Sequence, residues 1–515
     1  MVLKKASKYF TKLSVAKRRF SQVSNKQKWK SVVGLEVHAQ INSASKLFSG
    51  ASTKFSSPVN SNVSLFDCST PGTLPVLNKR CVEAGVLTAL SLNCKVNPIS
   101  YFDRKHYFYA DLPTGYQITQ QRAPLAVGGH LEFQVFTPGV HKVPYTTNVK
   151  IKQLQLEQDS GKSLHDEQRS FVDLNRAGVP LMELVFDPDL KDGEEAAALV
   201  KELISILQRI QTCSCKMEEG ALRVDANVSI HKESEPLGTR TEIKNIGSVR
   251  GVAGAISYEI QRQIKLKESG QTIANETRAW DASTKTTVAM RDKEVQQDYR
   301  YMPEPNLTPL HIAMGPVEIG CVNADQIKKT IPELPEETRQ RLRRDNGLTL
   351  EQSIILVNDS ALLNVFEEIV SKNINTKMVA TFLINDVNTL LNKKDMESED
   401  IKNPSHIGEV LELLEKEDIN RSTARDLLED ILSGNNKSPV QIVQKRNLLQ
   451  ISDETKLKKI CQEVMEENTK AVLDYKSGKT KALKALLGAI VAKSKNKANM
   501  KKCTAILHSL LRDKL

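Results

Sequence analysis

The chain has 515 residues, of which 40% are hydrophobic and 26% charged, as is usual for a folded globular protein. No apolar run approaches the ~18–20 residues that a membrane-spanning helix needs, so we expect no membrane span. This length exceeds what one hydrophobic core usually serves, which predicts two to four domains. The net charge of +11 is uneven, because much of the basic excess lies at the two ends.

The first 30 residues contain no Asp or Glu, and their Lys and Arg residues lie among Ser and scattered apolar residues. This composition is typical of a mitochondrial presequence, and it predicts a protein of the mitochondrial matrix. Arg18-Arg19-Phe20-Ser21 looks like a processing site with cleavage after Phe20. The alternative is a basic arm that contacts nucleic acid. We expect residues 1–30 to be removed and exclude them from the fold.

Residues 31–320 have a mixed character. Apolar and polar residues alternate in residues 32–41, 149–157, 222–231 and 239–245, which predicts strands. Apolar residues recur at helical spacing in residues 193–211 and 256–264. Strands with interspersed helices favour an α+β domain built around an antiparallel sheet.

The first predicted strand carries Glu36 and His38. Side chains two residues apart on a strand point the same way, so these two would project together, opposite a buried apolar face. A carboxylate beside an imidazole can ligate a metal or transfer a proton. An ordinary surface hydrogen bond is the alternative, and His38 could also orient Glu36 rather than bind a metal itself.

Residues 101–109 combine basic and aromatic side chains in the run Tyr-Phe-Asp-Arg-Lys-His-Tyr-Phe-Tyr. Such a mixture can stack bases and hold phosphates. A strand that packs its rings into a core is the alternative, and we favour it slightly.

Further acidic groups follow in segments with a strand pattern. Glu157 and Asp159 alternate before Gly161-Lys162-Ser163, which resembles the end of a phosphate-binding loop but lacks its earlier glycine, so we reject a Walker loop. The segment after Met217 places Arg223, Asp225 and Asn227 on one face, and the next places Arg240, Glu242 and Lys244 together. Residues 298–305 add a tyrosine- and proline-rich acidic stretch.

Acidic groups that face one cleft repel each other, and Mg²⁺ relieves that repulsion with oxygen ligands. Mg²⁺ with Arg or Lys nearby is the equipment of phosphoryl transfer. The alternative, at even odds, is a set of solvent-facing strands with cross-strand salt bridges.

The sequence becomes almost entirely helical after Ile331–Pro335. Ser405 is a candidate cap for a helix over residues 405–414, and Ser422 or Thr423 for one over residues 422–432, with Gly434 ending it. Residues 480–492 form another amphipathic pattern. We place a further boundary at Asn403-Pro404, which gives helical domains over residues 321–403 and 404–515.

The last forty residues are strongly basic, with acids nearly absent. Clustered lysines on short helices favour contact with a phosphate backbone without sequence readout. The eight cysteines show no C-x-x-C spacing, which predicts free thiols in a reducing compartment. Cys213-Ser-Cys215 alone is too little for a zinc site.

These segments, taken in order, closely resemble the B subunit family of tRNA-dependent amidotransferases, the GatB/GatE family. The resemblance rests on the following motifs: Val33-Gly-Leu-Glu-Val-His38, Phe102-Asp-Arg-Lys-His-Tyr-Phe-Tyr109, Leu112-Pro-Thr-Gly-Tyr-Gln117, Glu157-Gln-Asp-Ser-Gly-Lys162, Val172-Asp-Leu-Asn-Arg-Ala-Gly178, Met217-Glu-Glu-Gly-Ala-Leu-Arg-Val-Asp-Ala-Asn227 and Asp298-Tyr-Arg-Tyr-Met-Pro-Glu-Pro305. It covers roughly residues 31–515.

The resemblance implies a catalytic cradle, a helical linker domain and a tail that holds tRNA. It implies that ATP and Mg²⁺ activate the γ-carboxylate of glutamyl-tRNA(Gln), and that ammonia from a glutaminase A subunit then displaces phosphate. A small C subunit would brace the two larger subunits.

The matching motifs place catalytic and metal roles on Glu36, His38, Glu157, Asp225 and Glu242. They give weaker support for cofactor binding at Lys162, Glu218, Glu219 and Arg223. The basic tail would contact tRNA through its lysines, namely Lys481, Lys484, Lys493, Lys495, Lys497, Lys501 and Lys502.

Two departures from the family pattern matter. Many bacterial members carry a four-cysteine zinc site, but the matching positions here are Ser49, Ala51, Ser64 and Asp67, so we expect no zinc. The acidic run that often reads Glu-Glu-Asp is Glu157-Gln158-Asp159 here. If the second acid binds the metal in relatives, Gln158 weakens the site or shifts the task to Glu157.

The leading hypothesis is therefore an ATP- and Mg²⁺-dependent amidotransferase subunit that is active with its glutaminase partner. A non-catalytic tRNA-binding scaffold of an aminoacylation complex is the first alternative, and in that case the acidic positions would tolerate change. A Mg²⁺-dependent nuclease that degrades tRNA without ATP is the second.

Overall fold

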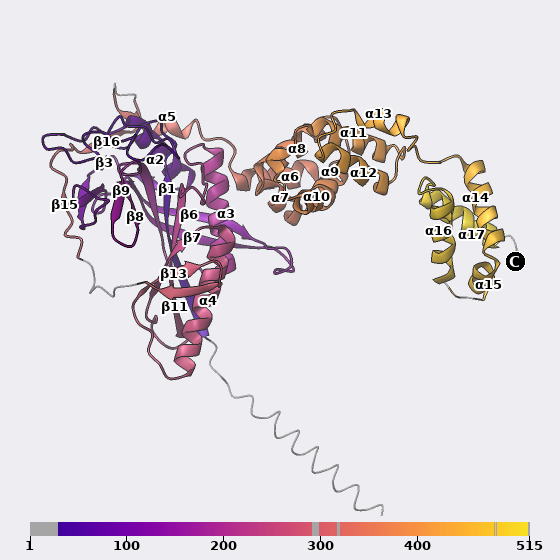
Figure 1. The fold of residues 1–515 in the computed structure, drawn as a ribbon, viewed down its shortest axis with the longest axis horizontal. Helices are drawn as coiled ribbons and strands as arrows, with labels where there is room; N and C mark the ends of the chain where they lie inside the picture. The colour runs from indigo at the N-terminus through magenta and orange to yellow at the C-terminus, as the bar shows by residue number, and fades with distance from the viewer. Residues whose placement is uncertain (1–28, 291–297, 317–319, 478, 480, 513–515) are drawn as a thin grey trace, which may run out of the picture. The chain divides into compact units, whose positions relative to one another are not determined.

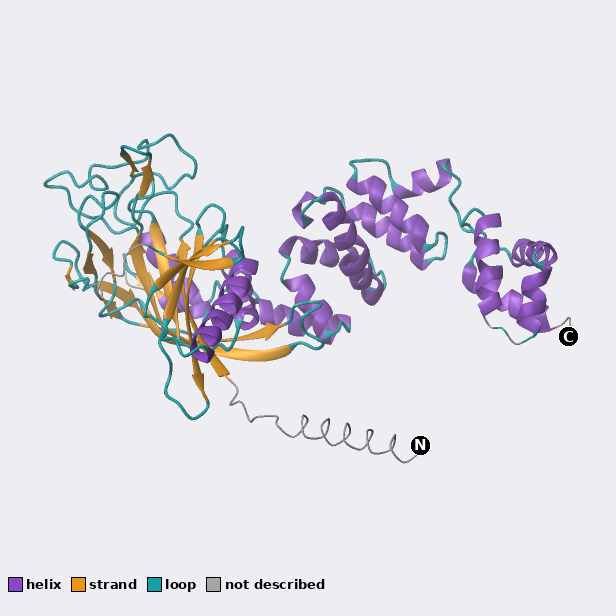
Figure 2. Cartoon of the chain, turned by 60° about the horizontal axis from the view of Figure 1, so that its bottom comes forward, coloured by secondary structure: helices purple, strands orange, loops and turns teal. Residues whose placement is uncertain are grey.

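The computed structural model describes residues 29–290, 298–316, 320–477, 479 and 481–512. The expected presequence lies almost wholly outside this described part. The chain divides into two compact units between Leu334 and Pro335. Among the described residues, strands occur only in the first unit, and the second consists of helices and loops (Figures 1 and 2). The α+β fold class predicted from the sequence is confirmed.

A nine-stranded sheet forms the centre of the first unit. Its order is β14 (Thr286–Ala289), β13 (Thr277–Asp281), β12 (Thr241–Ile246), β11 (Leu222–Lys232), β1 (Trp29–Gln40), β10 (Pro180–Phe186), β7 (Tyr145–Gln158), β6 (Ala126–Val135) and β2 (Lys95–Val96). Neighbouring strands are antiparallel except β12 and β13, which are parallel.

Smaller sheets complete the first unit. They are β15 (Met302–Pro303), β4 (Asp103–His106) and β5 (Tyr116–Thr119); β17 (Val322–Asn323), β16 (Leu310–Ala313) and β3 (Ile99–Ser100); and the hairpin of β8 (Lys162–His165) and β9 (Ser170–Asp173).

The pleat of β1 explains how the sheet separates core from site. Val33, Leu35, Val37 and Ala39 alternate along the strand, and all four are fully buried. Helices pack against the sheet and contribute to this core: α2 (Lys79–Ser91), α3 (Gly193–Arg209), α4 (Val249–Glu268) and, beside α2, α5 (Ala324–Lys328). The intervening side chains of β1 are therefore left on the other face of the sheet.

Helix α3 illustrates how the sequence sets these elements. Asp192 accepts hydrogen bonds from the amides of Glu194 and Glu195, which satisfies donors that the first turn leaves unpaired. The apolar side chains that follow at helical spacing are buried in the same core as the sheet.

The second unit consists of helices around two separate hydrophobic cores. The first core spans residues 342–443 and involves α6 (Pro335–Asn346), α7 (Leu350–Val357), α8 (Ser360–Val370), α9 (Thr376–Phe382), α10 (Asn388–Lys394), α11 (Pro404–Glu415), α12 (Arg421–Leu432) and α13 (Pro439–Lys445), with a π-helix at Leu383–Val387 and a 3-10 turn at Ser398–Asp400. The second spans residues 457–511 and involves α14 (Glu454–Glu467), α15 (Thr469–Lys476), α16 (Lys481–Lys493) and α17 (Met500–Arg512).

The expected boundary at Asn403-Pro404 falls between residues that share the first of these cores. The division into a linker domain and a tail domain therefore stays a prediction. Among the described residues, no helix combines the length and apolarity needed to cross a membrane. All eight cysteines are free.

Two predicted helix caps were wrong. Helix α11 begins at Pro404 after Asn403, because proline suits the first helical position, so Ser405 lies inside the first turn. Helix α12 is capped by Asn420, whose side chain accepts a hydrogen bond from the Thr423 amide, instead of by Ser422 or Thr423. Gly434 follows α12 with a φ of +88°, a conformation that glycine adopts without strain.

Candidate active site

Five adjacent strands of the large sheet, β12, β11, β1, β10 and β7, gather charged side chains on one face. The register places Glu36 opposite Asp225, and His38 opposite Arg223 on one side and Glu183 on the other. Asn227 stands opposite Glu242 on β12. Directly opposed side chains on one face lie close together, so strands far apart in sequence build one surface.

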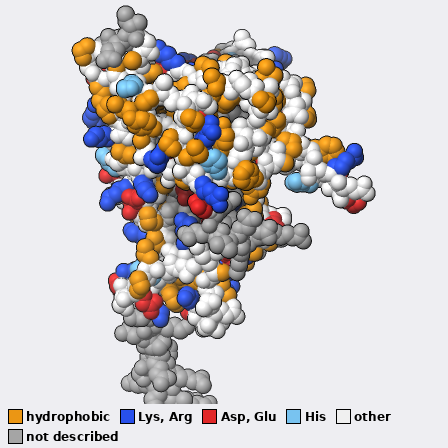
Figure 3. Space-filling model, turned by 90° about the vertical axis from the view of Figure 1, so that its left-hand side faces the viewer, with side chains coloured by type: hydrophobic (Ala, Val, Ile, Leu, Met, Phe, Trp, Pro, Cys, Tyr) orange, Lys and Arg blue, Asp and Glu red, His pale blue; other side chains and the backbone are white. Residues whose placement is uncertain are grey.

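This surface forms the floor of a cavity of about 1570 Å³. The small sheet β15-β4-β5 and its flanking loops add lining residues, among them Lys105, Gln117 and four tyrosines. Figure 3 shows one face of the first unit, with basic and acidic side chains lying next to each other in its middle. The cavity is thus lined mainly by polar and charged groups.

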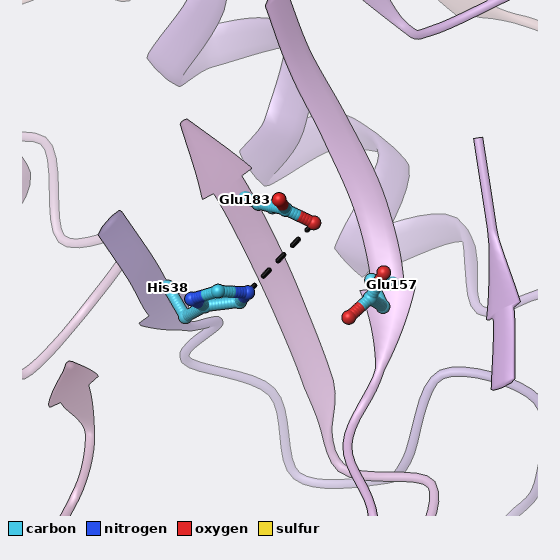
Figure 4. Close-up of side chains that lie close together, drawn as sticks. All are labelled: His38, Glu157 and Glu183. Atoms are coloured by element: carbon cyan, nitrogen blue, oxygen red, sulfur yellow. Dashed lines mark ion pairs between the residues drawn. The ribbon is translucent and has the colours of Figure 1, made fainter. Parts of the chain in front are cut away.

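The first acidic cluster in the cavity consists of His38, Glu157 and Glu183, which converge from three adjacent strands (Figure 4). One potential ligand atom from each lies within 4.8 Å of the others. His38 Nε2 is 3.7 Å from Glu183 Oε2, and Lys105 Nζ is 3.9 Å from Glu157 Oε2. Oε2 of Glu157 accepts no hydrogen bond from the described residues.

Burial controls the protonation of this cluster. It raises the pKa of the Glu157 and Glu183 carboxyls and lowers the pKa of His38. Burial would also lower the pKa of Lys105, but the negative charges of Glu157 and Glu183 outweigh it and raise that pKa. Because a neutral imidazole is the form that binds metals, the low pKa of His38 suits a ligand.

Gln155 supports the first cluster through hydrogen bonds. Its amide donates hydrogen bonds to Glu183 Oε2 at 2.7 Å and to Thr119 Oγ1 at 3.1 Å. A contact with the Thr119 hydroxyl in turn favours the ionised form of Glu157. Gln155 and Thr119 thus orient two carboxylates without adding charge of their own.

The second cluster consists of Glu36, Asp225 and Glu242, and the last two pair with the ammonium group of Lys244. Lys244 Nζ is 2.8 Å from Asp225 Oδ2 and 3.2 Å from Glu242 Oε1. Asn227 donates to Glu36 Oε1 at 3.1 Å. Burial, followed by the charges of Glu242 and Asp225, raises the pKa of Glu36.

The five residues predicted to share metal and catalytic roles therefore line one cavity but fall into two groups. His38 and Glu157 join Glu183 in an arrangement of one nitrogen and two carboxylates that fits a divalent cation. Asp225 and Glu242 pair with the Lys244 ammonium instead, and Glu36 stands opposite Asp225. The roles of all five stay predictions.

The four weaker candidates differ in position. Arg223 lines the cavity, and its guanidinium is 2.9 Å from Asp159 Oδ2; that negative charge raises the arginine's pKa. Lys162, Glu218 and Glu219 do not line the cavity. Lys162 is exposed on β8, and Glu219 pairs with the neighbouring Lys216 at 2.8 Å.

Sequence reasoning missed Glu183 and did not single out Lys105. Glu183 interrupts the apolar run Val179–Phe186, and a lone acid in such a strand was the available signal. Lys105 was hidden in the aromatic stretch. Gln158, which raised a doubt about the acidic run, does not line the cavity, whereas Glu157 and Asp159 on either side of it do.

The segment that the family resemblance compares with a four-cysteine zinc site holds a buried ion pair. Lys46 Nζ is 3.1 Å from Asp67 Oδ2, and both side chains are fully buried. The Ser49 hydroxyl and the Ser64 amide also donate to the Asp67 carboxylate. With one carboxylate already ion-paired, two hydroxyls and Ala51, these positions do not fit the ligand set of Zn²⁺.

The predicted tRNA-contacting lysines lie on and between α16 and α17. Lys493 pairs with Glu463 at 2.9 Å and with Glu467 at 2.7 Å, and Lys502 donates to the Ser452 carbonyl at 3.0 Å. The remaining lysines make no ion pair with an acid of the described residues, and most are exposed: Lys481, Lys484, Lys495, Lys497 and Lys501. Their role in binding tRNA stays a prediction.

The chain matches known proteins over most of its length. A family model described as the GatB/GatE catalytic domain matches residues 31–318, and one described as the GatB domain matches residues 364–511. The chain is 58% identical to a protein from Aedes aegypti over 94% of each chain, and 56% identical to one from Drosophila melanogaster over 95% of this chain and 96% of the other. Both relatives are named as the mitochondrial B subunit of glutamyl-tRNA(Gln) amidotransferase.

A bacterial relative is less similar but matches over almost its whole length. The protein from Rickettsia typhi, named as the B subunit of aspartyl/glutamyl-tRNA(Asn/Gln) amidotransferase, is 42% identical over 95% of this chain and 98% of its own length. These matches show that the chain belongs to the GatB/GatE family, as an amidotransferase B subunit of the mitochondrial type.

Proposed function

We propose that this chain is the subunit of a mitochondrial glutamyl-tRNA(Gln) amidotransferase in which the glutamyl group is activated and amidated. The names of its relatives support the substrate, since they specify glutamyl-tRNA(Gln). The observation that carries the proposal is the cavity itself, which brings two acidic clusters together with the cationic side chains of Lys105, Arg223 and Lys244. We expect the protein to act in the mitochondrial matrix.

The chemistry requires two steps. An oxygen of the glutamyl γ-carboxylate attacks the terminal phosphorus of ATP, ADP departs, and γ-glutamyl phosphate remains. The nitrogen of ammonia then attacks the carbonyl carbon, phosphate leaves with the bonding electron pair, and the nitrogen loses a proton to give the amide. Phosphorylation is needed because an unmodified carboxylate has no good leaving group.

His38, Glu157 and Glu183 are the residues that fit Mg²⁺, which when bound supplies charge neutralisation for phosphoryl transfer. Lys105 and Lys244 present ammonium groups inside the cavity for the carboxylate and phosphate oxygens. Arg223 is kept in place by Asp159 and adds a fixed guanidinium. Preorganised cations of this kind stabilise charge that develops during transfer.

The chain would act within a complex. A glutaminase A subunit is the proposed source of ammonia, and a small C subunit is a further proposed partner. The exposed lysines of α16 and α17 are proposed to hold the tRNA(Gln) charged with glutamate, because basic side chains without neighbouring acids attract a phosphate backbone.

The deciding experiment incubates the assembled complex with glutamyl-tRNA(Gln), ATP and glutamine, and then identifies the amino acid on the tRNA. We expect glutaminyl-tRNA, and we expect none when ATP or Mg²⁺ is withheld. Unchanged glutamyl-tRNA in the complete mixture would favour a non-catalytic scaffold, and shortened tRNA without ATP would favour a nuclease.

The variants Glu36→Ala and Asp225→Ala test the site within that assay. Both should abolish amide formation while tRNA binding persists, because they lie in the cavity and not on the basic helices. Near-normal turnover in either variant would remove the second acidic cluster from the proposed mechanism.

A further inference from the structure

Four tyrosines form a continuous wall on one side of the cavity. Tyr107 and Tyr109 follow β4, and Tyr299 and Tyr301 precede β15, which pairs with β4. The ring centroids are 5.6 Å apart for Tyr107 and Tyr109, 6.1 Å for Tyr107 and Tyr299, and 6.0 Å for Tyr299 and Tyr301. We call these four residues the tyrosine wall.

The two outer rings of the tyrosine wall are open to solvent within the cavity. Tyr109 is 60% exposed and Tyr301 is 36% exposed, although both are large aromatic side chains. Rings that served only to fill a hydrophobic core would be buried. The sequence alternative in which residues 101–109 pack their rings into a core therefore does not describe Tyr109.

The tyrosine wall adjoins the acidic cluster. Lys105 Nζ lies 5.2 Å from the centroid of the Tyr299 ring and 3.9 Å from Glu157 Oε2. One ammonium group thus contacts both the wall and the cluster of His38, Glu157 and Glu183. A ligand that stacks on the tyrosine wall would therefore lie close to these charges.

We propose that the tyrosine wall is a subsite for an adenine ring. This inference rests on the proposed function, whose two substrates both carry adenine: ATP, and the 3′-terminal adenosine that bears the glutamyl ester on tRNA. Aromatic side chains beside basic groups bind nucleotides by stacking on the base while the cations hold phosphate. A cavity of about 1570 Å³ exceeds the common range for a single small ligand and leaves room for both substrates.

The first experiment measures binding to the assembled complex with Tyr301→Leu and Tyr109→Leu, each beside its phenylalanine counterpart. One arm compares ATP with inorganic triphosphate, and the other compares tRNA(Gln) with the same tRNA lacking its terminal adenosine. In one of the two arms, leucine should weaken binding of the probe that carries adenine roughly 5- to 100-fold. Binding of the matching probe without adenine should not change. Phenylalanine should retain affinity because stacking does not need the hydroxyl.

Tyr101→Leu is the matched control. Tyr101 belongs to the same aromatic stretch and is 48% exposed, but it does not line the cavity. This variant should bind all four probes normally.

The outcomes separate the sources and the alternatives. An effect confined to ATP identifies the nucleotide as the occupant, and an effect confined to complete tRNA identifies the terminal adenosine. If the leucine variants bind all four probes as tightly as the wild-type complex does, the adenine subsite is overturned. Equal loss with phenylalanine and leucine also overturns it, because the hydroxyl and not the ring would then be the binding group.

These binding arms do not depend on turnover. Failure of the proposed function would appear as wild-type complex that makes no glutaminyl-tRNA, whatever the tyrosine variants do. Failure of the adenine subsite would appear as a wild-type complex that makes glutaminyl-tRNA, together with leucine variants that bind every probe as the wild type does.

Discussion

Cations in the sheet cavity differ from those of the C-terminal helices in what surrounds them. In the cavity, Arg223 is bound to Asp159 and Lys244 to Asp225 and Glu242, so their positions are set before any ligand arrives. On α16 and α17, Lys484 and Lys501 are exposed and make no ion pair with an acid in the described ranges. The first arrangement suits chemistry on a small group, and the second suits long-range attraction to a polyanion.

The largest effect is expected where the cavity charges meet. Glu183→Gln removes one of two carboxylates around His38 while it preserves shape, so amide formation should fall by more than about 100-fold, beyond the 10- to 100-fold typical of groups that only support a ligand. The assay is amidation of glutamyl-tRNA by the complex, with tRNA affinity measured in parallel.

Retention of tRNA affinity in Glu183→Gln is as important as the lost turnover. The substitution leaves every lysine of α16 and α17 in place, so the two regions should separate cleanly. A variant that lost both properties together would mean that the cavity and the basic helices are not distinct functional regions.

The buried pair of Lys46 and Asp67 extends the comparison to a cation whose side chain is fully buried. Asp67→Asn leaves an ammonium group buried without its counter-charge, which should destabilise the chain by about 3–5 kcal/mol. The double variant Lys46→Met/Asp67→Leu removes both charges and should recover most of that stability. Thermal unfolding in the complex checks this, and a double variant as unstable as the single one would contradict the charge argument.

Local patterns sufficed to predict much of the fold and part of the site. Alternation predicted β1, β7, β11 and β12, and it placed Glu36 and His38 on one strand face because pleating is a property of the local chain. Which strands become neighbours depends on long-range packing, so the sequence did not show that β10 would bring Glu183 beside His38. For the same reason, the sequence did not show that Lys244 would pair with both Asp225 and Glu242, two predicted metal ligands.

Gln155 provides a test of positioning without charge. Gln155→Leu removes the hydrogen bond to Glu183, and Mn²⁺ affinity of the complex, followed by electron paramagnetic resonance, should fall about 10- to 100-fold. Thr119→Val should act in the same direction, and Thr119→Ser should restore affinity because it keeps the hydroxyl. Equal affinities in the valine and serine variants would show that the hydroxyl does not orient the cluster.

The smallest effects belong to single lysines of the C-terminal helices. Lys484→Gln or Lys501→Gln should weaken tRNA binding by less than about tenfold and lower the slope of log affinity against log salt by about one. Lys493→Gln is the matched control, because that ammonium already pairs with Glu463 and Glu467. The two carboxylates offset its positive charge, so this variant should change the salt slope less. If all three variants changed the salt slope equally, then prior ion pairing would not distinguish the lysines. Ion pairing would then not account for the difference between the cavity cations and those of the C-terminal helices.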